Sequence, residues 1–279
     1  MRTRLHPVLV SPLRVLTWAV VSCVLLGMSM SAEAFAKGGD RMERSRKSVT
    51  PISAMKCPTL SGSGMIYAIG SSTLGSTLGP ELARILKKQK RKFRKWGKAS
   101  TGLARPDYHD WAKEVRNVAR EWKPSLFLIS LGSNDFQALK EGKKWISPFK
   151  EPHRWRTVYA KRVDELLEAA SGKGHGRAVI WITPNVFKGK KPQKIGRWVH
   201  DILIDRIKHF EGPAFLVDTY VATTNKDGSP RSRFQIPGKE GDFSLFASDG
   251  LHLSTRAVHS LMLDPALELI DRCLPPARP

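Results

Sequence analysis

The sequence of 279 residues has few cysteines, few acidic residues and, beyond its N-terminal region, no long hydrophobic run. Nothing after residue 36 is apolar for long enough to span a membrane, which takes about 20 residues. No internal repeat is evident, which argues against an array of repeated units. With 3 cysteines in all, no more than one intramolecular disulfide can form. The remaining residues therefore favour an ordinary globular domain.

Residues 1–36 are predicted to be a signal peptide. They combine an arginine-rich start, an apolar run over residues 15–30 and small residues suited to cleavage at 32–36. An uncleaved anchor is the alternative, but the run is short for a membrane span. Cys23 loosely resembles a lipoprotein cleavage site, although the apolar run continues past it. We therefore expect a periplasmic or secreted protein with no transmembrane segment after cleavage.

Two segments follow the signal peptide. Residues 37–56 are basic and polar without apolar periodicity, which predicts a flexible linker. Residues 57–279 are long enough for one domain with a sizeable core. This domain holds Cys57 and Cys273, which in an oxidising compartment form either a disulfide or two buried thiols.

The charge is strongly positive. The formal net charge is +22, and removal of residues 1–36 would leave about +20. Basic residues are densest over 87–98, where a helix is expected to end and cations suit the helix dipole. Such a run is either a solvated face or a site of attraction to anionic surfaces. Together with export, it indicates cell-wall polymer, acidic polysaccharide or anionic lipid as a partner, and no nucleic acid is expected.

Short apolar runs alternate with helical patterns along residues 57–279. Strands are predicted at 65–69, 126–131, 178–182 and 214–217, with a charged edge strand at 92–96. Helices are predicted over 80–86, 110–122, 159–170 and 199–210, and from residue 258 onward, where Pro265 is expected to restart the helix. Residues 138–154 and 222–245 are expected to be loops. The alternation predicts a three-layer α/β/α sandwich with a mainly parallel central sheet of about five strands.

Four small-residue loops, most of them at predicted strand ends, carry the candidate chemistry. Ester hydrolysis needs an activated hydroxyl, a base, an orienting carboxylate and donors for the oxyanion. Ser72 can supply the hydroxyl, His252 the base and Asp249 the carboxylate. The backbone N–H groups of Ser72 and Gly102 and the side-chain amide of Asn134 are candidates for the oxyanion hole.

These loops resemble the blocks of the SGNH, or GDSL-like, hydrolase superfamily. The matching segments, in the superfamily's order, are Gly70-Ser71-Ser72, Gly102, Gly132-Ser133-Asn134-Asp135 and Asp249-Gly250-Leu251-His252. The segments 98–108 and 248–252 look most like an exported bacterial branch. The resemblance implies an SGNH/flavodoxin-like fold and a serine hydrolase that uses no metal and no organic cofactor.

One residue departs from the superfamily's pattern. Ser71 stands where the aspartate of Gly-Asp-Ser is usual, which leaves open a shifted alignment with Ser71 as the reactive serine. Trp145 is a candidate for substrate contact. Four other histidines lack metal-ligand spacing and are interpreted as surface or packing residues; they are His109, His153, His200 and His259.

The sequence therefore predicts an exported serine esterase. Its substrate would be an acyl ester, with acetyl the preferred group, on a carbohydrate or cell-wall polymer. Two alternatives remain open. The same serine could transfer the acyl group to a sugar hydroxyl, or the loss of the aspartate could mark an inactive module that binds anionic wall polymer.

Overall fold

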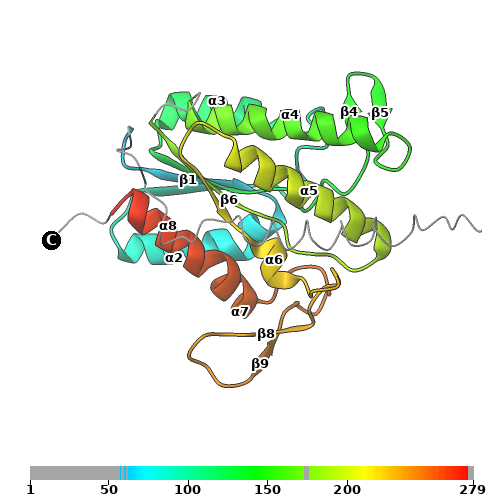
Figure 1. Ribbon diagram of the computed structural model, residues 1–279. Helices are drawn as coiled ribbons and strands as arrows, with labels where there is room; N and C mark the ends of the chain where they lie inside the picture. The colour runs from blue at the N-terminus through cyan, green and yellow to red at the C-terminus, as the bar shows by residue number, and fades with distance from the viewer. Residues whose placement is uncertain (1–56, 58–59, 61, 173–175, 276–279) are drawn as a thin grey trace, which may run out of the picture. The chain divides into compact units, whose positions relative to one another are not determined.

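The computed structural model describes residues 57, 60, 62–172 and 176–275 (Figure 1). The chain divides into two units, residues 1–50 and residues 51–279, and every described residue belongs to the second. The predicted signal peptide and linker, residues 1–36 and 37–56, lie outside the described residues. Among those described, no helix is both long and apolar enough to cross a bilayer.

A five-stranded sheet forms the centre of the domain, in the order β2-β1-β3-β6-β7. The strands are β1 Ile66–Gly70, β2 Phe93–Gly97, β3 Leu126–Ser130, β6 Ala178–Ile182 and β7 Ala214–Val217. Every pairing within this sheet is parallel. The charged strand β2 lies at one edge, where its outward side chains remain in water. The predicted sheet, including its edge strand, is confirmed.

Helices cover both faces of the sheet (Figure 1). On one face lie α3 Trp111–Trp122, α4 Pro152–Ser171 and α5 Lys190–Lys208, packed against alternate strand residues such as Ile69 and Trp181. On the other lie α2 Gly79–Lys88, α7 Thr255–Val258 and α8 Asp264–Cys273, packed against the intervening residues such as Ala68 and Ile180. Because every central strand is buried on both faces, its sequence is apolar throughout. The three-layer α/β/α prediction is confirmed.

Two predicted loops contain short hairpins instead. Residues 138–154 form β4 Leu139–Glu141 and β5 Lys144–Ile146 and then enter α4, which Pro152 opens. Residues 222–245 follow α6 Thr219–Thr223 and include β8 Arg233–Gln235 and β9 Asp242–Ser244. Strands this short leave almost no alternating pattern in the sequence. The second hairpin projects below the sheet in Figure 1.

The C-terminal helical region is interrupted by a π-helical turn rather than by a break. The turn η3, His259–Leu263, joins α7 to α8, and Pro265 lies in the first turn of α8. A second π-helical turn, η2 Leu74–Leu78, leads into α2. Both π turns therefore follow the segments that carry the predicted catalytic residues, which is where such turns are frequently found.

The basic segment 87–98 is divided between two edges of the sheet. Helix α2 returns the chain from the carboxyl end of β1 to the amino end of β2, so Lys87, Lys88 and Lys90 lie at the amino edge. Strand β2 then brings Lys98 to the carboxyl edge, where its backbone N–H donates to the carbonyl of Gly70 at 2.9 Å. The segment is therefore not one continuous face.

A disulfide joins Cys57 to Cys273, with the two Cα atoms 5.0 Å apart. Of the two alternatives left open by the sequence, the structure has the disulfide. The bond ties the start of the described chain to the last turn of α8.

We expect reduction of this disulfide to lower the free energy of unfolding by about 2 to 5 kcal/mol, because it closes a long loop in the unfolded chain. Urea denaturation with and without reductant measures the change. The double variant Cys57→Ser/Cys273→Ser should show the lower stability under both conditions. Equal urea midpoints for the oxidised and the reduced natural protein would contradict this expectation.

Candidate active site

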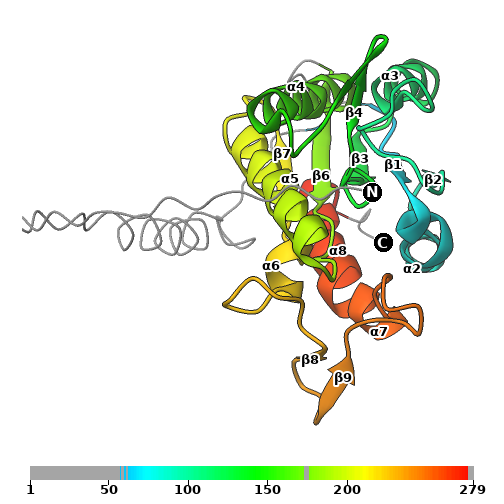
Figure 2. The same ribbon diagram turned by 90° about the vertical axis from the view of Figure 1, so that its right-hand side faces the viewer.

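Ser72 lies at the carboxyl edge of the sheet, which faces the viewer in Figure 2, directly after β1. A side chain at Gly70 would place its Cβ 2.7 Å from the carbonyl oxygen of Ser130, so only glycine fits where the chain leaves the strand. The turn is held by backbone hydrogen bonds of Ser71, which donates to Ser130 O at 3.2 Å and accepts from Gly75 N at 3.0 Å. Ser72 therefore begins the helix that leads into α2.

Ser72 is linked to His252 and Asp249 by hydrogen bonds. Ser72 Oγ lies 3.0 Å from His252 Nε2, although 180 residues separate them in the sequence. His252 Nδ1 lies 2.7 Å from Asp249 Oδ2. Ser71, in contrast, is only 2 % exposed. Of the two neighbouring serines, the structure thus brings Ser72 to the histidine.

The Asp–His loop, residues 249–252, is also held by hydrogen bonds from its own backbone to the Asp249 carboxylate. Asp249 Oδ1 accepts from the N–H of Leu251 at 2.9 Å and from that of His252 at 3.0 Å. The hydrogen bond from His252 and these two backbone bonds lower the pKa of Asp249 to about 2. Asp249 is therefore a carboxylate at neutral pH, able to hold the Nδ1–H of His252.

The Ser72–His252–Asp249 arrangement is open to solvent. The side chains of His252 and Asp249 are 46 % and 49 % exposed. Ser72 is half-buried. Such an open site can accept a group carried on a large molecule without requiring a deep pocket.

The loops that carry Gly102 and Asn134 leave the strands on either side of β1. Gly102 follows β2 and Asn134 follows β3, and the two loops meet where Asn134 Nδ2 donates to Thr101 O at 2.9 Å. The structure therefore places both predicted oxyanion donors in loops that flank the turn of Ser72. Gly102 is buried and Asn134 is half-buried.

Asp135 fixes the loop that contains Gly102. The sequence placed Asp135 in the segment Gly132-Ser133-Asn134-Asp135 but did not reveal this role. Its carboxylate is buried, accepting from Ala104 N at 2.7 Å and from the Tyr159 hydroxyl at 3.0 Å. Burial raises the pKa of Asp135, while backbone N–H donors, including that of Leu103, favour the ionised form. No local spacing pattern marks this role, because Ala104 and Tyr159 lie 31 and 24 residues away.

Arg162, on α4, braces the same loop from the other side. Its guanidinium donates to Leu103 O at 2.7 Å and to Ala104 O at 2.9 Å, and also to Lys140 O on β4. One cation thus joins the Gly102 loop to the β4–β5 hairpin. The hairpin is consequently tied to the Gly102 loop through Arg162.

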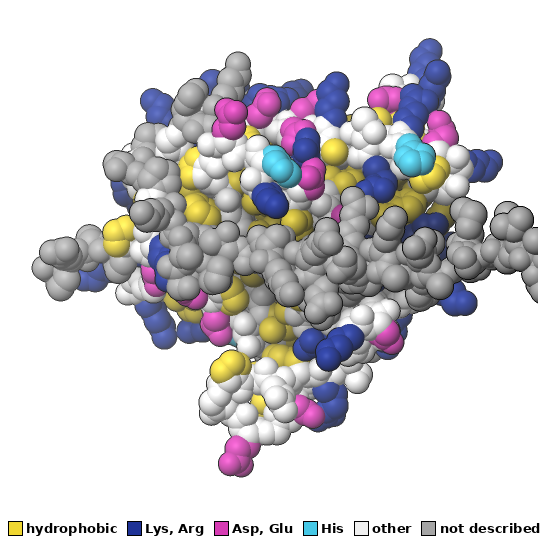
Figure 3. Space-filling view, in the orientation of Figure 1, with side chains coloured by type: hydrophobic (Ala, Val, Ile, Leu, Met, Phe, Trp, Pro, Cys, Tyr) yellow, Lys and Arg dark blue, Asp and Glu magenta, His cyan; other side chains and the backbone are white. Residues whose placement is uncertain are grey.

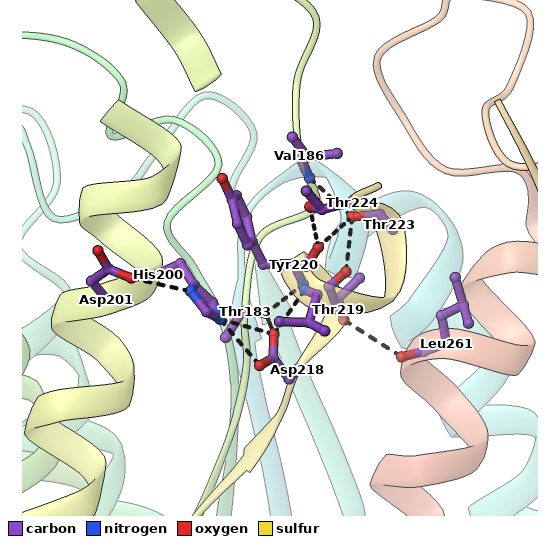
Figure 4. Close-up of polar contacts among 11 residues, drawn as sticks. Thr183, Val186, His200, Asp201, Asp218, Thr219, Tyr220, Thr223, Thr224 and Leu261 are labelled. Carbon is purple, nitrogen blue, oxygen red and sulfur yellow. Dashed lines mark hydrogen bonds and ion pairs between the residues drawn. The ribbon is translucent and has the colours of Figure 1, made fainter. Parts of the chain in front are cut away.

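An ionic network around the buried His200 lies at the carboxyl ends of β6 and β7 (Figure 4). His200 Nε2 lies 3.1 Å from both oxygens of Asp218, and its Nδ1 lies 3.6 Å from Asp201. Burial would lower the pKa of His200, but the hydrogen bonds to Asp201 and Asp218 outweigh it and raise the pKa to about 9. His200 is therefore protonated at neutral pH. Its buried position agrees with its interpretation as a packing residue.

This network extends to the Asp–His loop. Asp218 accepts from the Thr183 hydroxyl at 3.5 Å and caps α6 by accepting from Val221 N at 3.0 Å. The segment that begins at Thr183 then brings Asn185 to the loop, where its side-chain amide donates to Leu251 O at 3.4 Å. The ends of β6 and β7 therefore support the backbone beside His252.

The three other histidines named in the sequence analysis have packing or surface positions. His109 is buried beside Trp111, where burial and then the charge of Lys98 lower its pKa. His153 is exposed, and His259 pairs with Glu81 at 3.3 Å. Within the part of the chain that the structure describes, no group of three His, Cys, Asp or Glu side chains is placed to hold a metal ion.

Comparison with known proteins gives a family and several similar folds. Residues 65–264 match the family described as "Protein of unknown function (DUF459)". A comparison with curated sequences finds no match. Three similar solved structures are a lipolytic G-D-S-L family member from Veillonella parvula, the M. smegmatis aryl esterase and a Clostridium thermocellum family 3 carbohydrate esterase.

These structures share little sequence with the chain. Their identities are 16 %, 15 % and 11 %, and their TM-scores are 0.47, 0.46 and 0.47. The matches cover 75 %, 76 % and 78 % of this chain and 98 %, 100 % and 100 % of the respective structures. At this level, the likeness carries no information about substrate or mechanism.

We expect Gly102→Ala to lower the free energy of unfolding by about 1 to 3 kcal/mol, because overpacking beside a buried group displaces it. A Cβ at residue 102 would lie 2.2 Å from Asp135 Oδ1. Gly75→Ala is the matched control, since its Cβ would come no closer than 4.0 Å to Gly97 Cα. Urea denaturation of both variants measures the difference, and equal midpoints would contradict the assigned close packing.

The His200 network predicts that stability falls as the solution becomes alkaline. A histidine whose pKa rises on folding stabilises the folded state fully below its ordinary pKa of 6.5, and this stabilisation is lost as pH rises through about 9. We expect a loss of up to about 3 kcal/mol across that range. Urea denaturation at several pH values measures it. The variant His200→Gln should show a flatter profile, and identical profiles would exclude His200 as the source.

Proposed function

The chain belongs to the DUF459 family, and we propose that it is an exported serine esterase that removes acyl groups, preferentially acetyl, from a carbohydrate or cell-wall polymer. The observation that carries this proposal is the hydrogen-bonded series from Ser72 through His252 to Asp249. A hydroxyl, an imidazole and an ionised carboxylate in this order form a nucleophile, its base and the group that orients the base.

In the first half of the reaction, Ser72 Oγ attacks the ester carbonyl carbon while His252 Nε2 takes the hydroxyl proton. Asp249 accepts the Nδ1–H of His252, which leaves Nε2 free to act as the base and stabilises the imidazolium that forms. His252 then gives the proton to the departing alcohol oxygen as the carbonyl–oxygen bond breaks. The acyl group remains on Ser72.

The developing negative charge on the carbonyl oxygen needs donors. The Ser72 N–H lies in the first turn of a helix, where N–H groups lack intrahelical partners and the helix dipole favours negative charge. The Gly102 N–H and the side-chain amide of Asn134 are the further donors we propose. Asp135 and Arg162 support this role because they fix the loop that carries Gly102.

In the second half, a water molecule attacks the acyl group while His252 removes its proton. The carboxylic acid leaves when His252 returns a proton to Ser72 Oγ. The exposure of His252 favours hydrolysis over transfer to a sugar hydroxyl, because transfer requires that water be excluded. The same exposure favours a polymeric substrate. The intact contact between Ser72 and His252 weighs against an inactive binding module.

Export is supported by an observation independent of the predicted signal peptide. The Cys57–Cys273 disulfide suits an oxidising compartment such as the periplasm or the exterior. We therefore propose that the protein acts outside the cytoplasm.

We expect a fluorophosphonate probe to form one adduct, on Ser72, because this reagent labels serines activated by a neighbouring base. Intact-mass analysis followed by peptide mapping measures it. His252→Ala should abolish labelling, and Ser72→Ala should lower ester hydrolysis by about 10⁴-fold or more. Ser71→Ala is the matched control that retains the base and the nucleophile. An adduct on Ser71, or none on the folded protein, would overturn the assignment.

A further inference from the structure

The exposed apolar side chains gather at the edge of the sheet where Ser72 lies. Among the described residues, four large hydrophobic side chains are exposed, namely Tyr108, Trp145, Phe149 and Leu251. The first follows β2, the next two lie on or just after the hairpin that follows β3, and the last is in the Asp–His loop. The first three follow carboxyl ends of the parallel strands β2 and β3, and the Asp–His loop meets the same edge where His252 contacts Ser72. Their shared edge is therefore the candidate binding surface of the domain.

A lysine or arginine lies over each of the three exposed aromatic rings. The cation-to-ring-centroid distances are 5.2 Å for Lys98 on Tyr108, 4.7 and 4.6 Å for Arg105 and Lys140 on Trp145, and 5.8 Å for Lys191 on Phe149. An aromatic ring holds a cation in place and leaves its positive charge uncancelled, whereas a carboxylate would neutralise that charge. Figure 3 shows Lys and Arg side chains projecting over the β4–β5 hairpin.

These pairs form a nearly continuous series, which we call the aromatic–cation rim. The backbone turn between Arg105 and Tyr108 joins the first two pairs, with Tyr108 N donating to Arg105 O at 3.0 Å. The series continues through Lys191, in the first turn of α5, to Lys188, which lies 5.9 Å from the ring of Phe246. From there the rim reaches the Asp–His loop.

Most of the rim's positive charge is not paired. Within residues 62–172 and 176–275, Lys140, Lys188 and Lys191 form no ion pair with a carboxylate. Arg105 does pair with Asp107, at 2.9 Å. The rim therefore combines apolar ring surface with lysines that form no ion pair, at the edge of the sheet that carries half-buried Ser72.

We propose that the aromatic–cation rim binds an acidic carbohydrate polymer and presents its acyl esters to Ser72. This inference rests on the proposed esterase function and narrows its substrate to glycans that carry carboxylate or phosphate groups. The free cations attract the anionic groups, and apolar faces of sugar rings cover the exposed aromatic surface. A lipid surface fits less well, because Leu251 is the single aliphatic member and membrane binding grows with the apolar area inserted.

The test measures binding in a Ser72→Ala background, so that it does not depend on turnover. The rim variant carries Lys140→Gln, Lys188→Gln and Lys191→Gln. The matched control carries Lys87→Gln, Lys88→Gln and Lys90→Gln, which remove the same charge from the opposite edge of the sheet. Polygalacturonate serves as the acidic probe, neutral galactan as its uncharged counterpart and phosphatidylglycerol vesicles as the lipid surface. Affinity is measured at two salt concentrations, with circular dichroism as the check on folding.

We expect the rim variant to bind polygalacturonate about tenfold more weakly, with a smaller salt dependence, and the control variant to bind it unchanged. An equal loss of affinity for polygalacturonate in both variants would show attraction by overall charge and would overturn the proposal. Equal binding of galactan, or binding to vesicles without binding to polygalacturonate, would also overturn it. Failure of the esterase proposal is separately visible as the absence of a Ser72 adduct in the natural protein.

Discussion

The close approach of Gly70 to the end of β3 is the constraint on which the site depends. A Cβ atom at residue 70 would lie 2.7 Å from Ser130 O and 2.8 Å from Leu74 Cβ, which is too close for any residue but glycine. The chain can therefore turn sharply from a fully buried strand into a helix, and Ser72 emerges at the edge. Ser71 contributes backbone hydrogen bonds to this turn. An aspartate side chain at that position is consequently not needed to make the turn in this chain.

A second constraint is the buried carboxyl group of Asp135. Asp135 has no solvent exposure, so its carboxylate can remain there only while N–H and O–H donors surround it. Those donors come from the Gly102 loop and from Tyr159 on α4, and Arg162 binds the carbonyls of the same loop. Satisfying one carboxylate thus fixes a loop, a helix and a hairpin relative to each other. The contacts of Asp135 and Arg162 therefore position the Gly102 loop beside the more exposed residues of the site.

The sequence is informative where periodicity or local spacing carries the signal. Strands β1, β3 and β6 are apolar because both of their faces are covered, and Asp249 lies within one turn of His252, so both features could be predicted. The hairpins β4–β5 and β8–β9 could not, because three-residue strands have no measurable period. The His200 network could not be predicted from the sequence either, because Asp218 lies directly after β7 and His200 lies on α5.

The division of the basic segment 87–98 shows why a dense run of basic residues in the sequence does not define a basic surface of the fold. Lys87 and Lys98 lie in one run of the sequence, yet α2 and β2 carry them to opposite edges of the sheet. Conversely, Arg105, Lys140 and Lys191 are far apart in the sequence and lie on rings at the same edge. Because surface electrostatics decays over about 10 Å at moderate salt, the charge at this edge depends on the residues that the fold places there, not on the length of a basic run in the sequence. The net charge of +22 therefore gives no location on the surface, whereas the cations that lie over aromatic rings have a defined one.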